Sequence, residues 1–272
     1  MSLSIITNIG SLIAANALTA NQTNLNQSIA QLSSGKRIVS AADDPAGLAI
    51  AAETTGLIGA LNQANANTTN AQSFLQTADG ALANITNLLQ TGQQLATEAA
   101  DGSYNASQLT ALDGQYQAIL STINQIANGS TFNGISLFTG TAVTFQVGAT
   151  NTANDQLTIT IPKVDTTTLA INATTLTTQA NAQAALTAVT TALATVATDR
   201  GTIGASEQQL SAIGANLQST VSNLTQALSS IQDANVAQTF AKFTKESVLQ
   251  QAGVQILRQA DATPQQLLPL FQ

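Results

Sequence analysis

The chain has 272 residues and contains no Cys, His or Trp. This excludes thiol catalysis, the Ser–His–Asp triad and the usual zinc, copper and haem ligand sets, and we expect no enzyme activity, cofactor or metal. Charged residues make up 8% of the chain against about 25% in a typical domain, and the formal net charge of −7 argues against nucleic acid and anionic membranes as partners. No apolar run approaches the ~20 residues of a transmembrane helix, and residues 1–6 lack the basic segment of a cleavable signal peptide.

Residues 3–33 form the first predicted helix. Leu18, Leu25 and Leu32 are seven apart, and Ser33-Ser34-Gly35 is a helix stop with Gly as the left-handed cap. No charged residue occurs before Lys36. A polar face without charge offers little electrostatic repulsion, which favours packing against copies of the same chain.

The second predicted helix begins at Pro45 and runs to about Ala99. Asp44 is placed to cap it and Pro45 suits the first helical position, so we interpret Asp43 and Asp44 as capping residues rather than as an acid/base pair. Its heptad repeat predicts a seam through Leu61, Leu75, Leu82 and Leu89.

A shorter helix and a hairpin follow. The break at residues 101–103 starts a third helix that Asn128-Gly129 ends. Two alternating runs around Phe145 and Ile159 predict one β-hairpin at about 140–162, packed on the helices. Residues 163–178 are Thr-rich, which indicates an extended surface connection or a small cap.

Residues 186–231 carry the longest heptad repeat and contain no proline. Its seam runs through Val196, Ile203, Leu210, Leu217, Leu224 and Ile231. A helix of this length needs a partner as long as itself, so the fold class is mainly α: a long antiparallel coiled-coil-like bundle built from N- and C-terminal segments. Arg200 and Glu207 interrupt the seam, either as a polar break that fixes the register or because they face solvent.

A last helix runs to about Ala262, and both chain ends carry uncharged apolar stripes. We expect these stripes to be buried against other copies of the chain, although they could also be ordinary core. The predicted self-assembly residues are Ile5, Ile9, Leu12, Leu18, Leu25, Phe240, Phe243, Val254, Leu257, Leu268 and Phe271.

Several long motifs resemble those of bacterial flagellin. Residues 32–50 (LSSGKRIVSAADDPAGLAI) are similar to the family's N-terminal motif, and residues 249–268 are similar to its C-terminus. Phe132-Asn133-Gly134 and residues 145–149 match the segments around its hairpin. The likeness covers essentially the whole chain and is weakest at 150–185, where only about 30 residues stand in place of the larger outer domains of other members. The chain therefore resembles a minimal type.

The resemblance implies a structural subunit that assembles helically into an extracellular filament used for swimming. It also implies an inner domain from residues 1–40 plus 233–272 and a helical rod domain from 41–232. Export without a cleavable signal peptide, an export chaperone, and hook-associated and cap proteins as further partners are implied in the same way.

Two alternatives remain open. The first is a hook–filament junction protein of the same wider family, and the second is a secreted enzyme or adhesin whose function lies in the hairpin region. One departure from the family concerns recognition by the animal Toll-like receptor: Thr91 and Gln93 stand where many recognised members carry arginines, while Arg200 matches a family arginine.

Overall fold

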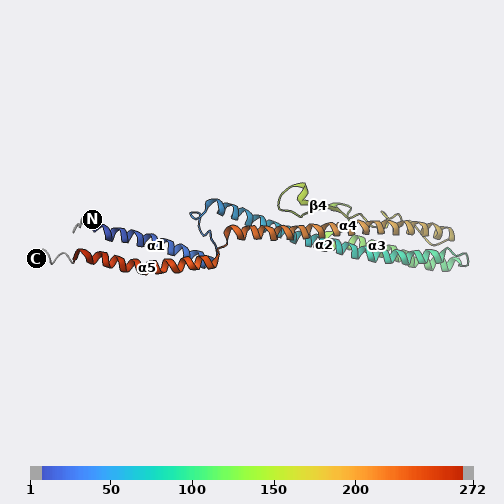
Figure 1. The fold of residues 1–272 in the computed structure, drawn as a ribbon. Helices are drawn as coiled ribbons and strands as arrows, with labels where there is room; N and C mark the ends of the chain where they lie inside the picture. Colours follow the sequence, from blue (N-terminus) through green and yellow to red (C-terminus); the bar gives the residue numbers. More distant parts are fainter. Residues whose placement is uncertain (1–7, 266–272) are drawn as a thin grey trace. The chain divides into compact units, whose positions relative to one another are not determined.

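The computed structural model describes residues 8–265, which contain five α-helices and two small antiparallel ladders (Figure 1). The elements in order are α1 (Ile9–Ser34), α2 (Pro45–Ala99), α3 (Ala106–Gly129), β1 (Thr131–Phe132), β2 (Ile135–Ser136), β3 (Ala142–Gln146), the 3-10 helix η1 (Ala153–Asp155), β4 (Gln156–Thr160), α4 (Gln179–Gln232) and α5 (Val236–Gln265). The predicted mainly α fold with one small hairpin region is confirmed.

Local capping chemistry sets the helix boundaries. The Asp44 carboxylate accepts a hydrogen bond from the Gly47 N–H at 2.9 Å, which satisfies one of the free N–H groups at the start of α2. Asn105 and Gln108 form a reciprocal capping box at the start of α3. Gly35 ends α1 in the left-handed conformation, with φ of 70°. The interpretation of Asp44 as a cap is confirmed.

The chain folds into two compact units. One combines the chain up to Ile58 with the chain from Asn223 onward, and the other is Gly59–Ser222. The units therefore divide within α2 and α4. The domain boundaries expected from the sequence lie near residues 40 and 233, at the breaks between helices. That division into domains stays a prediction.

The second unit holds the apolar core of the protein. α2, α3 and α4 contribute residues at heptad spacing, and small side chains such as Ala71, Ala78 and Ala192 allow the helices to pack closely. The predicted seam residues that are buried here are Leu61, Leu75, Leu82, Leu89, Val196, Ile203, Leu210 and Leu217. The last two members of the predicted seam, Leu224 and Ile231, belong to the first unit and are half-buried.

The hairpin of β3 and β4 packs on the helices through aromatic contacts. Its register pairs Val143 with Ile159 and Phe145 with Leu157. The ring of Phe74, on α2, meets the rings of Phe132 and Phe145 edge-on at centroid distances of 5.8 and 5.6 Å. Two strands alone are marginal in water, so this contact with α2 stabilises the hairpin.

The Thr-rich segment 163–178 is not a surface connection, contrary to that sequence-based expectation. Four of its apolar side chains are buried in the core: Val164, Leu169, Ile171 and Leu176. The backbone N–H and hydroxyl of Thr166 both donate to the Asn124 amide oxygen at 3.0 Å, and the Leu176 N–H donates to Asp113 at 2.7 Å. These bonds anchor the segment, which forms no strand or α-helix before Gln179, to α3.

The charged residues that interrupt the α4 seam have different environments. The Arg200 guanidinium makes a two-pronged pair with the Asp79 carboxylate of α2 at 2.7 and 3.0 Å. Glu207 does not pair with Arg200, and one of its carboxylate oxygens is buried without a hydrogen-bond partner among the described residues. Asp199 likewise has a buried unpaired oxygen, and burial raises the pKa of its carboxyl above the ordinary value.

We expect the Asp199→Asn substitution to stabilise the fold at pH 7 and to have a smaller effect in acid. The folded-state pKa of Asp199 lies above the unfolded-state pKa, so the cost of burying the charge is absent below the unfolded value and complete above the folded one. The gain at pH 7 should be about 0.5–1 kcal/mol in the free energy of urea unfolding, and it should shrink as the pH falls toward about 4, the ordinary value for Asp, and be absent below it. Glu53→Gln, at an exposed position, is the matched control. A gain for Asp199→Asn that does not change between pH 7 and pH 3 would show that burial of the charge is not the cause.

Candidate self-association surface on α1 and α5

α1 and α5 lie side by side and antiparallel in the first unit (Figure 1). At the start of α1, the Asn8 side chain accepts a hydrogen bond from the Ser11 N–H and donates one to the Ala260 carbonyl oxygen at 2.8 Å. At the other end of α1, the Gly35 carbonyl oxygen accepts from the Ala234 N–H at 2.9 Å. The pair is thus fastened at both ends by groups that would otherwise be unsatisfied helix termini.

The seam between α1 and α5 has heptad spacing but few large apolar residues. The positions on α1 that are half-buried or buried at alternating spacings of three and four are Ser11, Ala14, Leu18, Asn21, Leu25, Ser28 and Leu32. The matching positions on α5 are Thr239, Phe243, Glu246, Gln250, Gly253, Leu257 and Ala260. We call these two rows the α1/α5 seam. More than half of its members are polar or no larger than alanine, so apolar burial within it is small.

Hydrogen bonds cross the seam along its length. The Asn21 amide donates to the Glu246 carbonyl oxygen at 2.8 Å and to the Gln250 side chain at 3.1 Å. The Ser28 hydroxyl donates to the Glu246 carboxylate at 2.6 Å, with both residues buried. Near the open end, the Ser11 hydroxyl donates to Asp261, also at 2.6 Å, but this bond is exposed. Each such bond contributes roughly 0.5–1.5 kcal/mol, or up to about 3 kcal/mol where one partner is charged.

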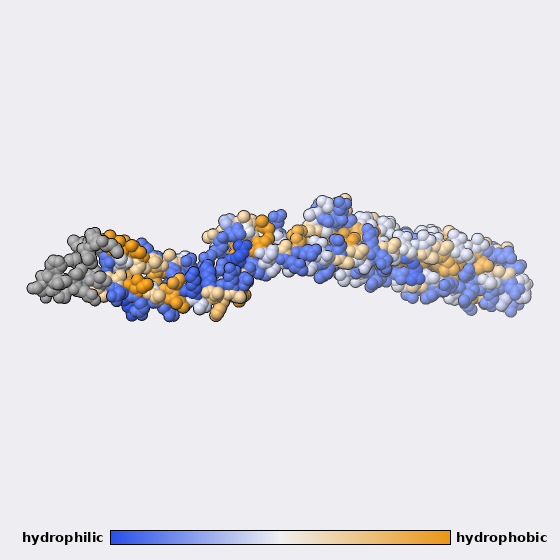
Figure 2. Space-filling model, viewed as in Figure 1, coloured by the Kyte–Doolittle hydropathy of each residue, from blue (hydrophilic) through white to orange (hydrophobic). Residues whose placement is uncertain are grey.

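Other large apolar side chains of the pair lie outside the seam rows and are exposed to solvent. Nine of them are between 46% and 64% exposed: Ile9, Leu12, Ile13, Ile29, Val236, Phe240, Val248, Leu249 and Ile256. We call this set the outer apolar face. Figure 2 shows hydrophobic residues gathered on the α1/α5 pair among hydrophilic ones. Exposed apolar area of this extent is typical of interaction surfaces, and burying each side chain would contribute roughly 1.5–3 kcal/mol.

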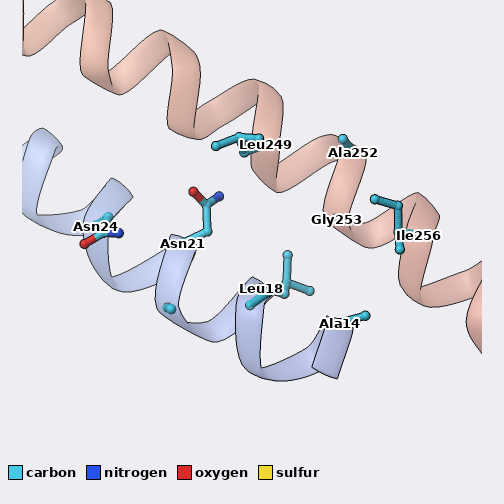
Figure 3. Close-up of a pocket in the computed structure, with 10 residues that line it drawn as sticks. Ala14, Leu18, Asn21, Asn24, Leu249, Ala252, Gly253 and Ile256 are labelled. Atoms are coloured by element: carbon cyan, nitrogen blue, oxygen red, sulfur yellow. The ribbon is translucent and has the colours of Figure 1, made fainter. Parts of the chain in front are cut away.

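A groove of about 470 Å³ between the two helices adjoins this face (Figure 3). Its lining combines small residues, including Ala17 and Ala252, with the outer-face side chains Leu249 and Ile256. Gly253 makes the close approach possible, since a Cβ atom there would stand 3.0 Å from Leu18 Cδ1. No charged residue lines the groove.

The predicted self-assembly residues fall into three groups. Ile9, Leu12 and Phe240 belong to the outer apolar face. The half-buried members, which face the partner helix or its edge, are Leu18, Leu25, Phe243, Val254 and Leu257. Ile5, Leu268 and Phe271 lie outside the described residues. A role in assembly stays a prediction for all of them.

Sequence reasoning missed other members of the outer apolar face, chiefly Ile13, Val248, Leu249 and Ile256. Leu249 and Ile256 are seven residues apart, a spacing that the sequence analysis could have used. The signal was obscured because the buried row of α5 carries Glu246, Gln250 and Gly253, while several large apolar residues of this helix lie outside that row.

The junction beside α1 and α5 joins two helix breaks. Arg37 donates two guanidinium hydrogen bonds to the Ile231 carbonyl oxygen, at 2.6 and 3.2 Å, and its backbone N–H donates to the Gln232 carbonyl oxygen at 2.7 Å. A positive group here complements the negative end of the α4 dipole. The N–H groups of Ser40 and Val39 donate to Asp43 and hold the pKa of its carboxyl below the usual range. The junction thus sets where α5 begins relative to the end of α1.

The described residues contain no cluster of three or more metal-binding side chains. No helix within residues 8–265 is long and apolar enough to cross a membrane.

Comparisons with known proteins identify the family of this chain. The family model for the bacterial flagellin N-terminal helical region matches residues 5–143, and the model for the bacterial flagellin C-terminal helical region matches residues 186–271. The chain belongs to the bacterial flagellin family. The two matched regions of this flagellin contain the helices that build both compact units, and residues 144–185 lie between them.

Curated relatives support the assignment over part of their length. Flagellin 1 of Proteus mirabilis is 36% identical over 167 residues, which cover 61% of this chain and 45% of the relative. The flagellin of Escherichia coli K12 is 37% identical over 167 residues, covering 61% of this chain and 33% of the relative. This flagellin therefore spans less than half the length of these relatives.

Solved structures agree with the fold. The crystal structure of Bacillus cereus flagellin superposes with a TM-score of 0.50 at 31% identity, covering 60% of this chain and 94% of that one. A putative flagellar hook-associated protein from Vibrio parahaemolyticus superposes with a TM-score of 0.60 at 15% identity, covering 70% of this chain and 100% of that one. The second likeness shows the fold alone.

We expect Arg37→Ala to loosen the junction by about 1 kcal/mol, because it removes the guanidinium bonds to Ile231 and one charge at the end of α4. Native-state hydrogen exchange should show faster exchange at the Arg37 and Ala234 amides, which bond across the junction. Arg37→Lys keeps the charge and loses the fork, so its effect should be intermediate. Exchange rates in Arg37→Ala equal to those of the parent chain would contradict this role.

Proposed function

We propose that the chain is the repeating structural subunit of an extracellular flagellar filament, which it forms by helical self-assembly for swimming motility. The observation that carries the proposal is the outer apolar face of α1 and α5. Within one copy these nine side chains stay in water, whereas a neighbouring copy could bury them. Family membership supports the same conclusion, since flagellins are structural rather than enzymatic proteins.

The driving force would be the surplus of apolar burial over electrostatic repulsion. α1 carries no charged residue, and the groove lining carries none either. Copies could therefore approach along these helices without desolvating charges, which is the main cost that charged surfaces impose on association. The few charges of α5, such as Lys245 and Arg258, are exposed and could remain in water.

The further partners form part of the proposal and rest on the family resemblance. They are a cytoplasmic export chaperone, hook-associated proteins and a distal cap, together with export that uses no cleavable signal peptide. The alternative role is that of a hook–filament junction protein, and the hook-associated neighbour has a similar fold. The two roles predict different behaviour, because a junction protein would not elongate filament fragments. Seeded growth of the purified chain separates the two roles.

We expect the double substitution Leu249→Ser/Ile256→Ser to raise the critical concentration for seeded polymerisation by at least about tenfold per residue. Each lost contact should remove roughly 1.5–3 kcal/mol, and 1.4 kcal/mol corresponds to a factor of ten. Both side chains are exposed in one copy, so the free energy of unfolding of the monomer should change by less than about 0.5 kcal/mol per site. Sedimentation of polymer against protein concentration measures the first quantity, and urea unfolding measures the second.

The matched control is Leu249→Met/Ile256→Met, which keeps apolar area at the same positions and should polymerise within about twofold of the parent chain. Serine variants that polymerise as well as the parent would contradict the assignment of the outer apolar face. A parent chain that caps filament seeds without lengthening them would instead favour the junction protein.

A further inference from the structure

We infer that the buried Ser28–Glu246 hydrogen bond fixes the alignment of α1 against α5, and that both are positioning residues for self-assembly although neither belongs to the outer apolar face. The consequence for assembly rests on the proposed function. The alignment itself is a property of one copy.

Ser28 and Glu246 are the most enclosed polar contact of the α1/α5 seam. Ser28 is 0% exposed and Glu246 is 5% exposed, and the hydroxyl donates to Glu246 Oε2 at 2.6 Å. The other carboxylate oxygen, Oε1, stands 3.8 Å from Lys242 Nζ on the preceding turn of α5. A carboxylate held out of water needs such partners, because leaving it unpaired costs far more than leaving an apolar side chain poorly packed.

The apolar part of the seam discriminates weakly between alignments. Its large apolar members on α1 are leucines at heptad spacing, Leu18, Leu25 and Leu32, which look alike to a helix that has slipped by seven residues. Gly253 and Ala260 on α5 offer little shape to distinguish them. A slip of one heptad would place Ser28 opposite Gly253 or Thr239 instead of Glu246. Glu246 would then face Gly35 or Asn21, and its carboxylate loses the buried Ser28 hydroxyl, which disfavours both slipped arrangements.

The alignment matters because the outer apolar face is assembled from two helices. Leu12 and Ile13 come from α1, while Leu249 and Ile256 come from α5. A slip of one heptad would move one set past the other by roughly 10 Å, at 1.5 Å per residue. The face would then no longer match the same face or groove on another copy. The junction at Arg37 limits such slips at one end, and the Ser28–Glu246 bond acts within the helix pair.

The chain offers a matched pair of substitutions for the test. Ser28→Ala and Ser11→Ala remove the same group from the same helix, and each hydroxyl donates to a carboxylate of α5 at 2.6 Å. The Ser28 bond is buried and the Ser11 bond is exposed. A third variant, Glu246→Gln, keeps an acceptor for the Ser28 hydroxyl and removes the charge.

Alignment is measured on the full, unpolymerised chain by electron spin resonance. The sequence has no native cysteine, so spin labels on Thr23→Cys and Gln251→Cys, both exposed positions, report the distance between α1 and α5 without interference. We expect a single distance in the parent chain, the same distance for Ser11→Ala and Glu246→Gln, and a second population for Ser28→Ala. Helical content by circular dichroism should stay unchanged in all of them.

Assembly is measured separately by the critical concentration of the same variants without labels. Ser28→Ala should raise it roughly tenfold, as expected for losing a hydrogen bond to a charged group, whereas Ser11→Ala should change it by less than about twofold. Ser28→Ala with one unshifted distance, or with a loss of helix and no second distance, would overturn the inference. A parent chain that never polymerises would contradict the proposed function. The distances between the spin labels would still test whether the Ser28–Glu246 bond fixes the alignment of α1 against α5.

Discussion

Large apolar side chains that one copy cannot bury are the constraint on which the first unit depends. α1 and α5 meet along a seam of small and polar residues, and this leaves nine bulky aliphatic and aromatic side chains in water. Such an arrangement is unfavourable for a solitary molecule and favourable for one that is covered by its own kind. The helix pair therefore exposes more large apolar side chains than its seam encloses.

The second unit, in contrast, buries most of its large apolar side chains within one copy. Its three helices, hairpin and Thr-rich segment enclose one continuous apolar core, in which Leu75, Leu82 and Val189 are fully buried. Polar contacts there, such as Arg200 with Asp79, supplement a core that is already apolar. In the first unit, by contrast, the polar contacts between the helices carry most of the specificity. The second unit therefore supplies the buried apolar core, and the first unit carries the exposed apolar side chains.

Much of the fold could be predicted from the sequence because heptads, caps and breaks are local signals. The boundaries of α2 and α4, the cap at Asp44 and the strand pairing around Phe145 and Ile159 follow from patterns within a few residues. The burial of Val164 and Ile171 could not be predicted in this way, since their segment has no apolar periodicity and is held to α3 by the hydrogen bonds of Thr166 to Asn124.

The outer apolar face was only half predicted, for a physical reason. Sequence reasoning assumes that the most apolar stripe of a helix faces its partner. On α5 the rule fails, because the inner row includes Thr239, Glu246 and Gln250, while Val236, Phe240 and Leu249 lie outside that row and are exposed. The inversion becomes visible only when the hydrogen bonds from Asn21 and Ser28 show which side of α5 meets α1.

The most direct test of this account is the reactivity of one outer-face position before and after assembly. The chain has no native cysteine, so a single Ile256→Cys substitution can be labelled with a maleimide in the free chain and in the polymer. The account predicts rapid labelling of the free chain and at least about tenfold slower labelling in the polymer, as apolar contact with a neighbouring copy excludes water and reagent. Equal labelling rates in the two states would contradict the claim that the outer apolar face is buried between copies.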